Sequence, residues 1–276
     1  MNKITKSHIV AYFIVGMGSI IMLAPFYFMF VFATHSNSDI LSVPPPVWFG
    51  SEFINNVGIL LDALPYFWHN IGLSFYVALM TTILNLFFCS LAGYAFAMFE
   101  FKGRNIMFVL IMGTMLLPPF LGMIPTALIM SQLEWMNQPR ALYIPMACGA
   151  MGIFMMRQFI ASAIPKELIE AARMDGCNEF AIYWRVVVPL ITPAFGTLGL
   201  ITFIGQWNNF MGPLVVMNDM KMFTVPLALR ALQGTGQVPW GAICAGAAIA
   251  VVPLMILFVM TSRKLIDGLT AGAVKG

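Results

Sequence analysis

Six long runs of apolar residues, nearly free of charge, dominate this sequence of 276 residues. An α-helix needs about 20 such residues to cross the hydrocarbon core of a bilayer. The runs lie at about 9–33, 68–98, 105–130, 141–160, 190–216 and 240–262. The fourth carries Arg157 near its end and requires that side chain to reach the membrane interface. We therefore expect an all-α, polytopic membrane helical bundle with six transmembrane helices, forming one domain over residues 1–276.

The composition excludes most other classes of protein. Only 9% of the residues are charged and 60% are hydrophobic, whereas a soluble domain has roughly 25% charged residues. So few charges cannot cover the surface of a soluble globule. So apolar a chain also has ample surface to bury, which excludes disorder. The net charge of +3 is too small and too dispersed to indicate a nucleic-acid partner.

The basic residues predict the orientation, because Lys and Arg concentrate in short cytoplasmic loops. With six spans, 11 of the 14 Lys and Arg residues fall on the side that carries both termini, and the other three are Arg140, Lys221 and Arg230. Both termini are therefore expected in the cytoplasm. The first run is preceded by Lys3 and Lys6, but it is longer than a signal-peptide core and Ala33-Thr34-His35 is no cleavage site. We expect an uncleaved first span.

No catalytic or metal-binding constellation is evident in the sequence. The four cysteines have neither disulfide nor metal spacing: Cys89, Cys148, Cys177 and Cys244. The spans contain no spaced carboxylate pair and no Ser/His/Asp set, which argues against an intramembrane enzyme. They also lack an intramembrane titratable relay of the kind that a proton-coupled carrier needs.

The most informative segment is the insert at 163–189, which holds seven charged residues between Lys166 and Arg185. Burying them in lipid would cost on the order of 20 kcal/mol, so the insert must lie outside the membrane. Pro165 suits the start of a helix and Gly176 suits its end. Two apolar ridges are predicted, one from Ile164, Leu168, Ala171 and Ala172, and a second from Phe180, Ala181, Trp184 and Val187 or Val188, ended by Pro189. The pattern alone fits a docking knob and an amphipathic hairpin on the membrane surface equally well.

The insert resembles the EAA loop of ABC importer permeases. The match runs through Glu170-Ala171-Ala172, three residues, Gly176, nine residues and then Val186-x-Val188-Pro189, and Asp175 also fits the family. Three further segments resemble the second permease subunit of maltose-type carbohydrate importers: Phe154–Phe159, Gln206–Phe210 with Pro213-Leu214, and Gly268–Gly276. The resemblance covers nearly the whole chain, and loop 34–67 is the least similar part.

This resemblance implies the ABC importer permease fold with a cytoplasmic EAA coupling-helix loop at 163–189. It implies a permease subunit, not an enzyme, in the bacterial inner membrane, passing a sugar or related polyol compound such as an oligosaccharide or a glycerol phosphate ester. Its partners would be a second homologous permease subunit, two ABC ATPase subunits and an extracytoplasmic solute-binding protein. The residues that contact the ATPase would be Glu170, Ala171, Ala172, Asp175 and Gly176. This chain would bind no cofactor; ATP-Mg would sit on the ATPases, which agrees with the lack of a G-x-x-x-x-G-K-[ST] segment here.

Polar side chains inside the spans are candidates for a substrate path. They are Gln206, Trp207, Asn208 and Asn209 in the fifth span, with Phe203 and Phe210 as further aromatic faces. Hydrogen bonds between helices explain such residues equally well, and for Asn85 in the second span we favour that explanation. Pro118, Pro119 and Pro125 interrupt the third span and allow kinks, which are either hinges or static bends.

Two segments on the outer side, 34–67 and 217–239, are longer than a turn requires. Each fits an ordered connector and the docking site of an external partner equally well. Residues 268–276 are small, carry one charge and are expected to be flexible and to contact the ATPase. The main alternative to the whole interpretation is a self-sufficient secondary carrier or channel for a small neutral solute.

Overall fold

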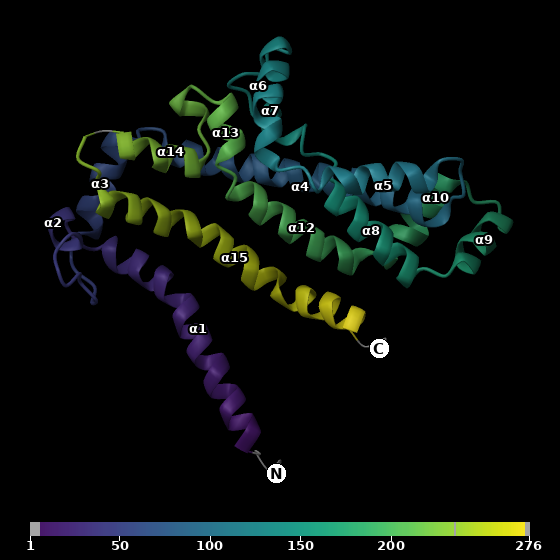
Figure 1. Ribbon diagram of the computed structural model, residues 1–276, viewed down its shortest axis with the longest axis horizontal. Coiled ribbons are helices and arrows are strands. Elements are labelled where there is room, and N and C mark those ends of the chain that lie inside the picture. Colours follow the sequence, from purple (N-terminus) through teal and green to yellow (C-terminus); the bar gives the residue numbers. More distant parts are fainter. Residues whose placement is uncertain (1–5, 235, 274–276) are drawn as a thin grey trace. The chain divides into compact units, whose positions relative to one another are not determined.

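The computed structural model describes residues 6–234 and 236–273, and within them every regular element is helical. The elements in chain order are α1 Lys6–Phe32, α2 Asn37–Ile40, α3 Phe53–Ala63, α4 Phe67–Met98, α5 Arg104–Thr114, η1 Pro119–Gly122, α6 Met123–Gln132, α7 Arg140–Tyr143, α8 Ala150–Ala163, α9 Lys166–Met174, α10 Glu179–Ile182, η2 Tyr183–Val187, α11 Val188–Leu190, α12 Thr192–Trp207, α13 Met211–Val216, η3 Met220–Met222, α14 Val225–Ala231, η4 Leu232–Gly234 and α15 Trp240–Ala273. Figure 1 shows this helical chain. The all-α expectation is confirmed for these residues.

Three helices in the described part are long and apolar enough to cross a membrane: Val10–Phe32, Phe67–Met98 and Trp240–Met260. The helices over Glu179–Leu190 and Thr192–Trp207 pass the same test together, but they meet at an angle of 78°. At 1.5 Å per residue, α4 is about 48 Å long, which exceeds the hydrocarbon thickness of about 30 Å. The count of six spans stays a prediction.

The third expected span, 105–130, is not one helix. α5 ends at Thr114, and α6 begins only at Met123. Between them Pro118 is extended, with φ −58° and ψ 128°. A proline restrains the residue before it to extended conformations and supplies no N–H for a helical hydrogen bond. The adjacent prolines therefore separate two short helices.

The fourth expected span, 141–160, is also divided. Its first residues form α7, an irregular segment around Pro145 follows, and α8 runs from Ala150 to Ala163. α8 is about 21 Å long. The guanidinium of Arg157 does not stand alone, because its Cζ lies 4.3 Å from the centre of the Phe108 ring. A cation over an aromatic face is stabilised by the ring quadrupole.

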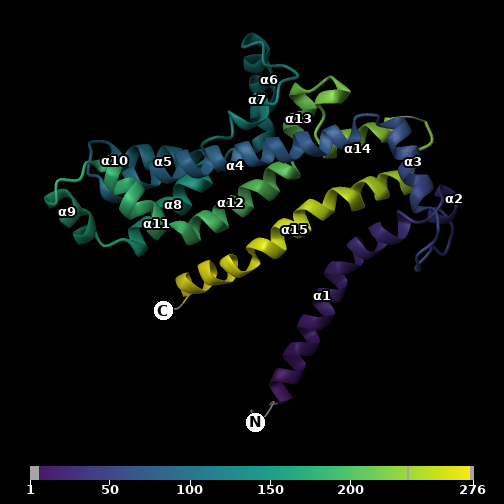
Figure 2. The ribbon, with the colours of Figure 1, turned by 180° about the vertical axis from the view of Figure 1, so that it is seen from behind.

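The chain forms two compact units. The first comprises residues 1–67 and 228–253, and the second comprises 68–227 and 254–276. In the first unit the end of α1 meets α3 and the start of α15 (Figure 2), with Ala33, Ala245 and Ala248 as the buried core. Asn56 of α3 donates from Nδ2 to the carbonyls of Ala33 and His35, each at 2.9 Å. These bonds satisfy carbonyls beyond the last turn of α1.

Residues 34–67 are thus more than an extended connector, because α2 and α3 lie within them. The three prolines at 44–46 lie outside these helices. The described residues of the second outer segment, 217–234 and 236–239, are also ordered. Asn70 of α4 donates from Nδ2 to the carbonyls of Met220, Lys221 and Phe223 at 3.0, 3.3 and 2.8 Å. These contacts favour the connector interpretation for that stretch of the outer segment.

In the second unit α4, α5, α8 and α12 lie side by side, with α9 and α10 at one end (Figures 1 and 2). The largest buried cluster joins these elements and includes Cys89, Met156, Ile160, Ile182 and Val187. Glycine permits the close approach of α4 and α8. A Cβ on Gly93 would lie 2.6 Å from Met156 Cβ, and one on Gly152 would lie 2.6 Å from Cys89 Sγ. Small residues at such contacts let helix backbones pack closely.

Candidate functional site

The insert at 163–189 begins with a helix whose two ends are well defined. Pro165 precedes α9 in an extended conformation, so the helix starts at Lys166. It ends at a left-handed turn, because Gly176 has φ +80° and the Cys177 N–H donates to the Ala172 carbonyl at 3.1 Å. Only glycine adopts this conformation without steric cost. The predicted break at Gly176 is confirmed.

The apolar side chains of α9 lie on two faces of the helix. Ile169 is 2% exposed and packs with Ala172 in the large core cluster. Leu168, which was expected on the apolar face, is 42% exposed, and Met174 is 87% exposed. The predicted apolar face is therefore divided: Ile164 and Ala172 pack toward the core with Ile169, whereas Leu168, Ala171 and Met174 form a ridge that faces away from it. Residues three apart share one face of a helix, and Ile169 with Ala172 forms the opposite pair.

The second predicted ridge is divided in the same way. Ile182, Tyr183 and Val187 are buried, whereas Phe180 and Trp184 are exposed. The segment Tyr183–Val187 is a π-helix, which moves the inward face by one residue. Pro189 does not end the helix, which runs to Leu190 and bends at Ile191 before α12. A proline and a π-bulge are both ordinary causes of such a kink.

A polar cluster that the sequence did not predict ties the insert to α4. Arg173 donates from Nε to Glu179 Oε1 at 2.6 Å, across the Gly176 turn. The hydroxyl of Tyr94 donates to the other oxygen of Glu179, Oε2, at 2.9 Å. The Arg173 guanidinium also lies over Phe99, 5.5 Å from its centre. The hydrogen bond from Arg173 holds the pKa of Glu179 below its ordinary value, and the same bond raises the pKa of Arg173.

A signal for this cluster existed in the sequence. Opposite charges at 173 and 179 flank a helix-breaking glycine, and a chain that reverses there brings them together. Tyr94 could not be foreseen, since it is 85 residues away from Glu179. A second contact between the same elements joins the hydroxyls of Ser90 and Tyr183 at 2.7 Å.

Glu170 and Asp175 lie on the exposed surface of the insert. Glu170 lines a hollow of about 340 Å³ together with Lys166, Ile169, Arg173 and the end of α4. Lys166 approaches Glu100 with 3.7 Å between Nζ and Oε1, both side chains being largely exposed. The insert therefore presents an apolar ridge beside several charges.

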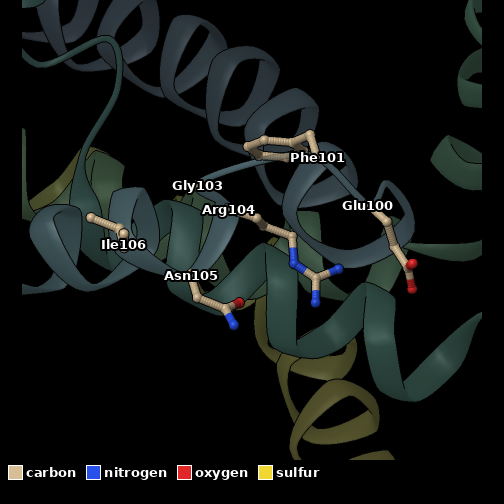
Figure 3. A pocket seen from close by; sticks show the side chains of 6 residues that line it. All are labelled: Glu100, Phe101, Gly103, Arg104, Asn105 and Ile106. Carbon is tan, nitrogen blue, oxygen red and sulfur yellow. The ribbon is translucent and has the colours of Figure 1, made fainter.

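The adjoining loop between α4 and α5 borders a second hollow, of about 430 Å³. Figure 3 shows Glu100, Arg104 and Asn105 presented on one side of this loop. Arg104 donates from Nη1 to the Phe99 carbonyl at 3.1 Å. This bond fixes the loop that carries Phe99 beneath Arg173.

The four candidate path residues of the fifth span point in different directions. Gln206 is 8% exposed, and its Oε1 accepts from Asn209 Nδ2 at 3.3 Å, while its Nε2 has no partner in the described structure. Trp207 is buried and stacks on Phe203, with 6.0 Å between ring centres, so its face is not free. Asn208 is exposed and bonds to the carbonyl of Ile204 in its own helix.

Asn209 borders a largely apolar cavity of about 580 Å³, together with Met123 of α6, Leu142 of α7 and Val215 of α13. Gln206 and Asn209 are therefore joined to each other, and they are separated from Trp207 and Asn208. Asn85 donates to the carbonyl of Met146 at 3.2 Å, which confirms its role in bonding between chain segments. Among the described residues there is no group of three His, Cys, Asp or Glu side chains that could hold a metal ion.

Long apolar helices joined to a charged insert with an outward apolar ridge define a membrane protein with a surface on which a partner could dock. Comparison with known proteins gives the family. Residues 89–269 match the family model described as the inner membrane component of binding-protein-dependent transport systems. The chain belongs to this family, and it is a multi-pass inner-membrane permease subunit.

The chain is also similar to permease proteins of several named transport systems. The chain is 37% identical over 203 residues to the arabinooligosaccharides transport system permease protein AraQ of Bacillus subtilis, covering 74% of this chain and 72% of that one. It is 31% identical to the trehalose/maltose transport system permease protein MalG of Thermococcus litoralis, covering 94% and 93%. It is 29% identical to the sn-glycerol-3-phosphate transport system permease protein UgpE of Yersinia pestis, covering 91% and 92%.

A solved structure shares the fold. It is the crystal structure of a bacterial ABC transporter involved in the import of the acidic polysaccharide alginate. The TM-score is 0.79 at 23% sequence identity, over 95% of this chain and 99% of the other. The expected ABC importer permease fold is thereby confirmed. Permeases of this family work with ATPase subunits and a solute-binding protein.

Proposed function

We propose that this chain is one of two homologous permease subunits in an importer for a sugar or related polyol compound, such as an oligosaccharide or a glycerol phosphate ester. Two ATPase subunits that bind ATP-Mg and an extracytoplasmic solute-binding protein complete the assembly. Support for the substrate class comes from the relatives, which are named for arabinooligosaccharides, trehalose or maltose, and sn-glycerol-3-phosphate. The sugars and the phosphate ester each carry two or more free hydroxyl groups.

The insert is proposed as the coupling element. The observation that carries this is the division of α9 into two faces: Ile169 and Ala172 anchor the helix, while Leu168, Ala171 and Met174 face outward. An exposed apolar ridge on a charged insert fits a partner protein, since apolar side chains gain free energy when they leave water. Glu170, Asp175 and the Gly176 turn would form the rest of the contact with the ATPase.

Coupling then depends on the rigidity of the insert. The contacts Arg173–Glu179–Tyr94 and Ser90–Tyr183 join it to α4. When the ATPases close on ATP, the insert moves as one body and turns the attached spans. The path changes its opening from the inner to the outer side. The chain itself contributes no phosphate-binding loop to this step.

The experiment uses the complete transporter in proteoliposomes with ATP inside. Glu170→Lys and Met174→Glu place a new charge on the outward face and should reduce ATPase co-purification and uptake. Ser162→Lys, exposed at the end of α8, adds a comparable charge away from that face and should leave both unchanged. Normal assembly and uptake in both α9 variants would contradict the proposal, as would uptake by this chain alone without ATP.

Six spans near 9–33, 68–98, 105–130, 141–160, 190–216 and 240–262, within one domain and with cytoplasmic termini, remain part of the proposal. Fusing a reporter that is active only in the cytoplasm to each end tests the orientation. Activity at one end alone would require an odd number of spans.

The path for the substrate is proposed to run past Gln206, Trp207, Asn208 and Asn209. Gln206 and Asn209 are the main support for this path. Gln206 has a buried N–H donor without a partner in the described structure, and Asn209 lines the apolar cavity. Trp207 and Asn208 would act through position, since one is covered by Phe203 and the other is bonded to its own helix.

The tail 268–276 is proposed to contact the ATPase. Helix α15 continues to Ala273, so residues 268–273 are helical and not the flexible segment that composition predicted. Residues 274–276 lie outside the described residues. Deleting 268–276 should lower uptake and ATPase rate together; full activity would contradict the contact.

A further inference from the structure

The segment from Leu41 to Phe49, which follows the first helix, folds back onto that helix. The Tyr27 hydroxyl of α1 donates to the carbonyl of Val47 at 2.6 Å, and the rings of Tyr27 and Phe49 meet edge to face at 5.8 Å. The other end is held as well, because the Gly50 N–H donates to Thr34 Oγ1 at 2.8 Å. We call residues 41–49 the proline segment.

The depth of this contact along α1 is informative. Tyr27 lies five residues before the end of the apolar helix Val10–Phe32. At 1.5 Å per residue, that is about 7.5 Å below its end. A segment bonded to Tyr27 therefore lies at the level where a spanning helix leaves the hydrocarbon core and enters the headgroup region. It does not project into bulk water.

The chemistry of the segment fits that level. Residues 40–51 contain no charged side chain. The run Pro44-Pro45-Pro46 has no N–H group, so it brings no unpaired backbone donors to a medium poor in water. The Ser42 hydroxyl donates to the Asp39 carbonyl at 2.7 Å and to the Pro44 carbonyl at 3.0 Å, which satisfies further polar groups locally.

The apolar side chains of the segment are uncovered. Trp48 is 78% exposed and Val43 is 96% exposed, and Leu41 and Phe49 are exposed too. The neighbouring surface of α1 is equally bare, since only 6% of its apolar window is buried within the structure. The exposed surface of the segment is thus continuous with that of a membrane helix.

We propose that the proline segment is a membrane-interface anchor, with Trp48 and its neighbours inserted among lipid headgroups at the end of α1 remote from the N-terminus. Trp and Tyr are enriched at this level because their rings are apolar and their N–H or O–H groups reach polar partners. The anchor would fix the depth and tilt of the first span. This inference depends on α1 lying in a membrane and is independent of the substrate and the coupling helix.

The test uses the assembled transporter in liposomes and the tryptophan emission that is lost in Trp48→Phe. Brominated phosphatidylcholine quenches indoles within the lipid, and aqueous iodide quenches indoles in water. We expect brominated lipid to remove more of the Trp48 emission than iodide does. The same subtraction with Trp207→Phe is the control, because Trp207 is buried and its emission should resist both quenchers.

Two outcomes would overturn the anchor. Strong quenching by iodide without quenching by brominated lipid would place Trp48 in water. Resistance to both quenchers would mean that a protein subunit covers it. Adding the purified solute-binding protein resolves the first case further: loss of the iodide quenching on its addition would assign the segment to that partner and not to lipid.

Discussion

Arg173 Nε lies 2.6 Å from Glu179 Oε1, so the two charges on either side of the Gly176 turn close it as an ion pair. Both side chains are partly open to water, and pairs of this kind contribute only about 0–1 kcal/mol to stability. The significance of the pair is geometric, since Glu179 also accepts from Tyr94 of α4. The turn, the coupling helix and a long helix thereby share one carboxylate.

Replacing this carboxylate should loosen the insert without unfolding the chain. In Glu179→Gln the charge-assisted bond from Arg173 is lost, and we expect less solute transported for each ATP hydrolysed. Lys166→Gln is the control, because the pair of Lys166 with Glu100 is long and largely exposed. Measuring uptake and hydrolysis in the same proteoliposomes gives the ratio. Equal ratios in Glu179→Gln and the control would show that the ion pair does not stiffen the coupling.

The same pair predicts a dependence on pH. The pKa of Glu179 is lower in the folded protein because Arg173 donates to it. Its contribution is therefore present above the ordinary glutamate pKa of about 4.3 and is lost as the pH falls through the lower, folded value. The melting temperature of wild type minus that of Glu179→Gln should be constant near neutral pH and shrink in acid. A difference that grows in acid would have the opposite sign and refute this linkage.

Gly176 offers a test of backbone conformation alone. A Cβ there would meet nothing within 4 Å, but its φ of +80° is unfavourable for other residues. Gly176→Ala should cost about 1 kcal/mol, and Gly176→Asn less, because Asn tolerates left-handed geometry. Gly205→Ala, in a helix and equally uncrowded, should be neutral or stabilising. Thermal melting in detergent ranks the variants, and equal effects of Ala at 176 and 205 would contradict the strain argument.

Because α4 packs closely on α8, the stability of the fold should be sensitive to the size of the side chain at position 93. A Cβ at Gly93 would lie 2.8 Å from the backbone nitrogen of Arg157 and 2.6 Å from Met156 Cβ. Gly93→Val should thus lower stability by about 1–3 kcal/mol through overpacking. Gly72→Val lies in the same helix with open space around it and serves as the control. The yield of monodisperse protein and its melting temperature report the difference; a Gly93 variant as stable as its control would exclude the close approach.

Substitutions at Gln206 and Asn85 distinguish a residue that serves transport from one that serves stability. Its Nε2 is buried without a partner in the described structure, and an unsatisfied buried donor costs about 1–3 kcal/mol. Gln206→Met removes this donor at similar volume and also the long 3.3 Å bond accepted from Asn209; the two effects oppose each other, so the melting temperature should change little while uptake falls. Asn85→Leu should instead lower stability, because it removes a bond to Met146. Unimpaired uptake in Gln206→Met would exclude Gln206 from the substrate path.

Sequence patterns predicted the membrane class, the helical fold and the glycine turn within the insert, because these depend on composition and local spacing. They failed where neighbouring helices decide which face is buried. Leu168 and Ile169 are adjacent and equally apolar, and only packing against the core cluster turns Ile169 inward. The same holds for Phe180 and Ile182 next to the π-helix.

By itself, the sequence determined that this chain enters a membrane, and it predicts that residues 163–189 stay outside it, since moving charge into lipid costs more free energy than local preferences supply. The tertiary structure alone decided how Tyr94 meets Glu179 and how Tyr27 holds the proline segment. Each of these depends on the directions in which helices carry side chains from distant positions. Hydrophobic spacing along one helix does not contain that information.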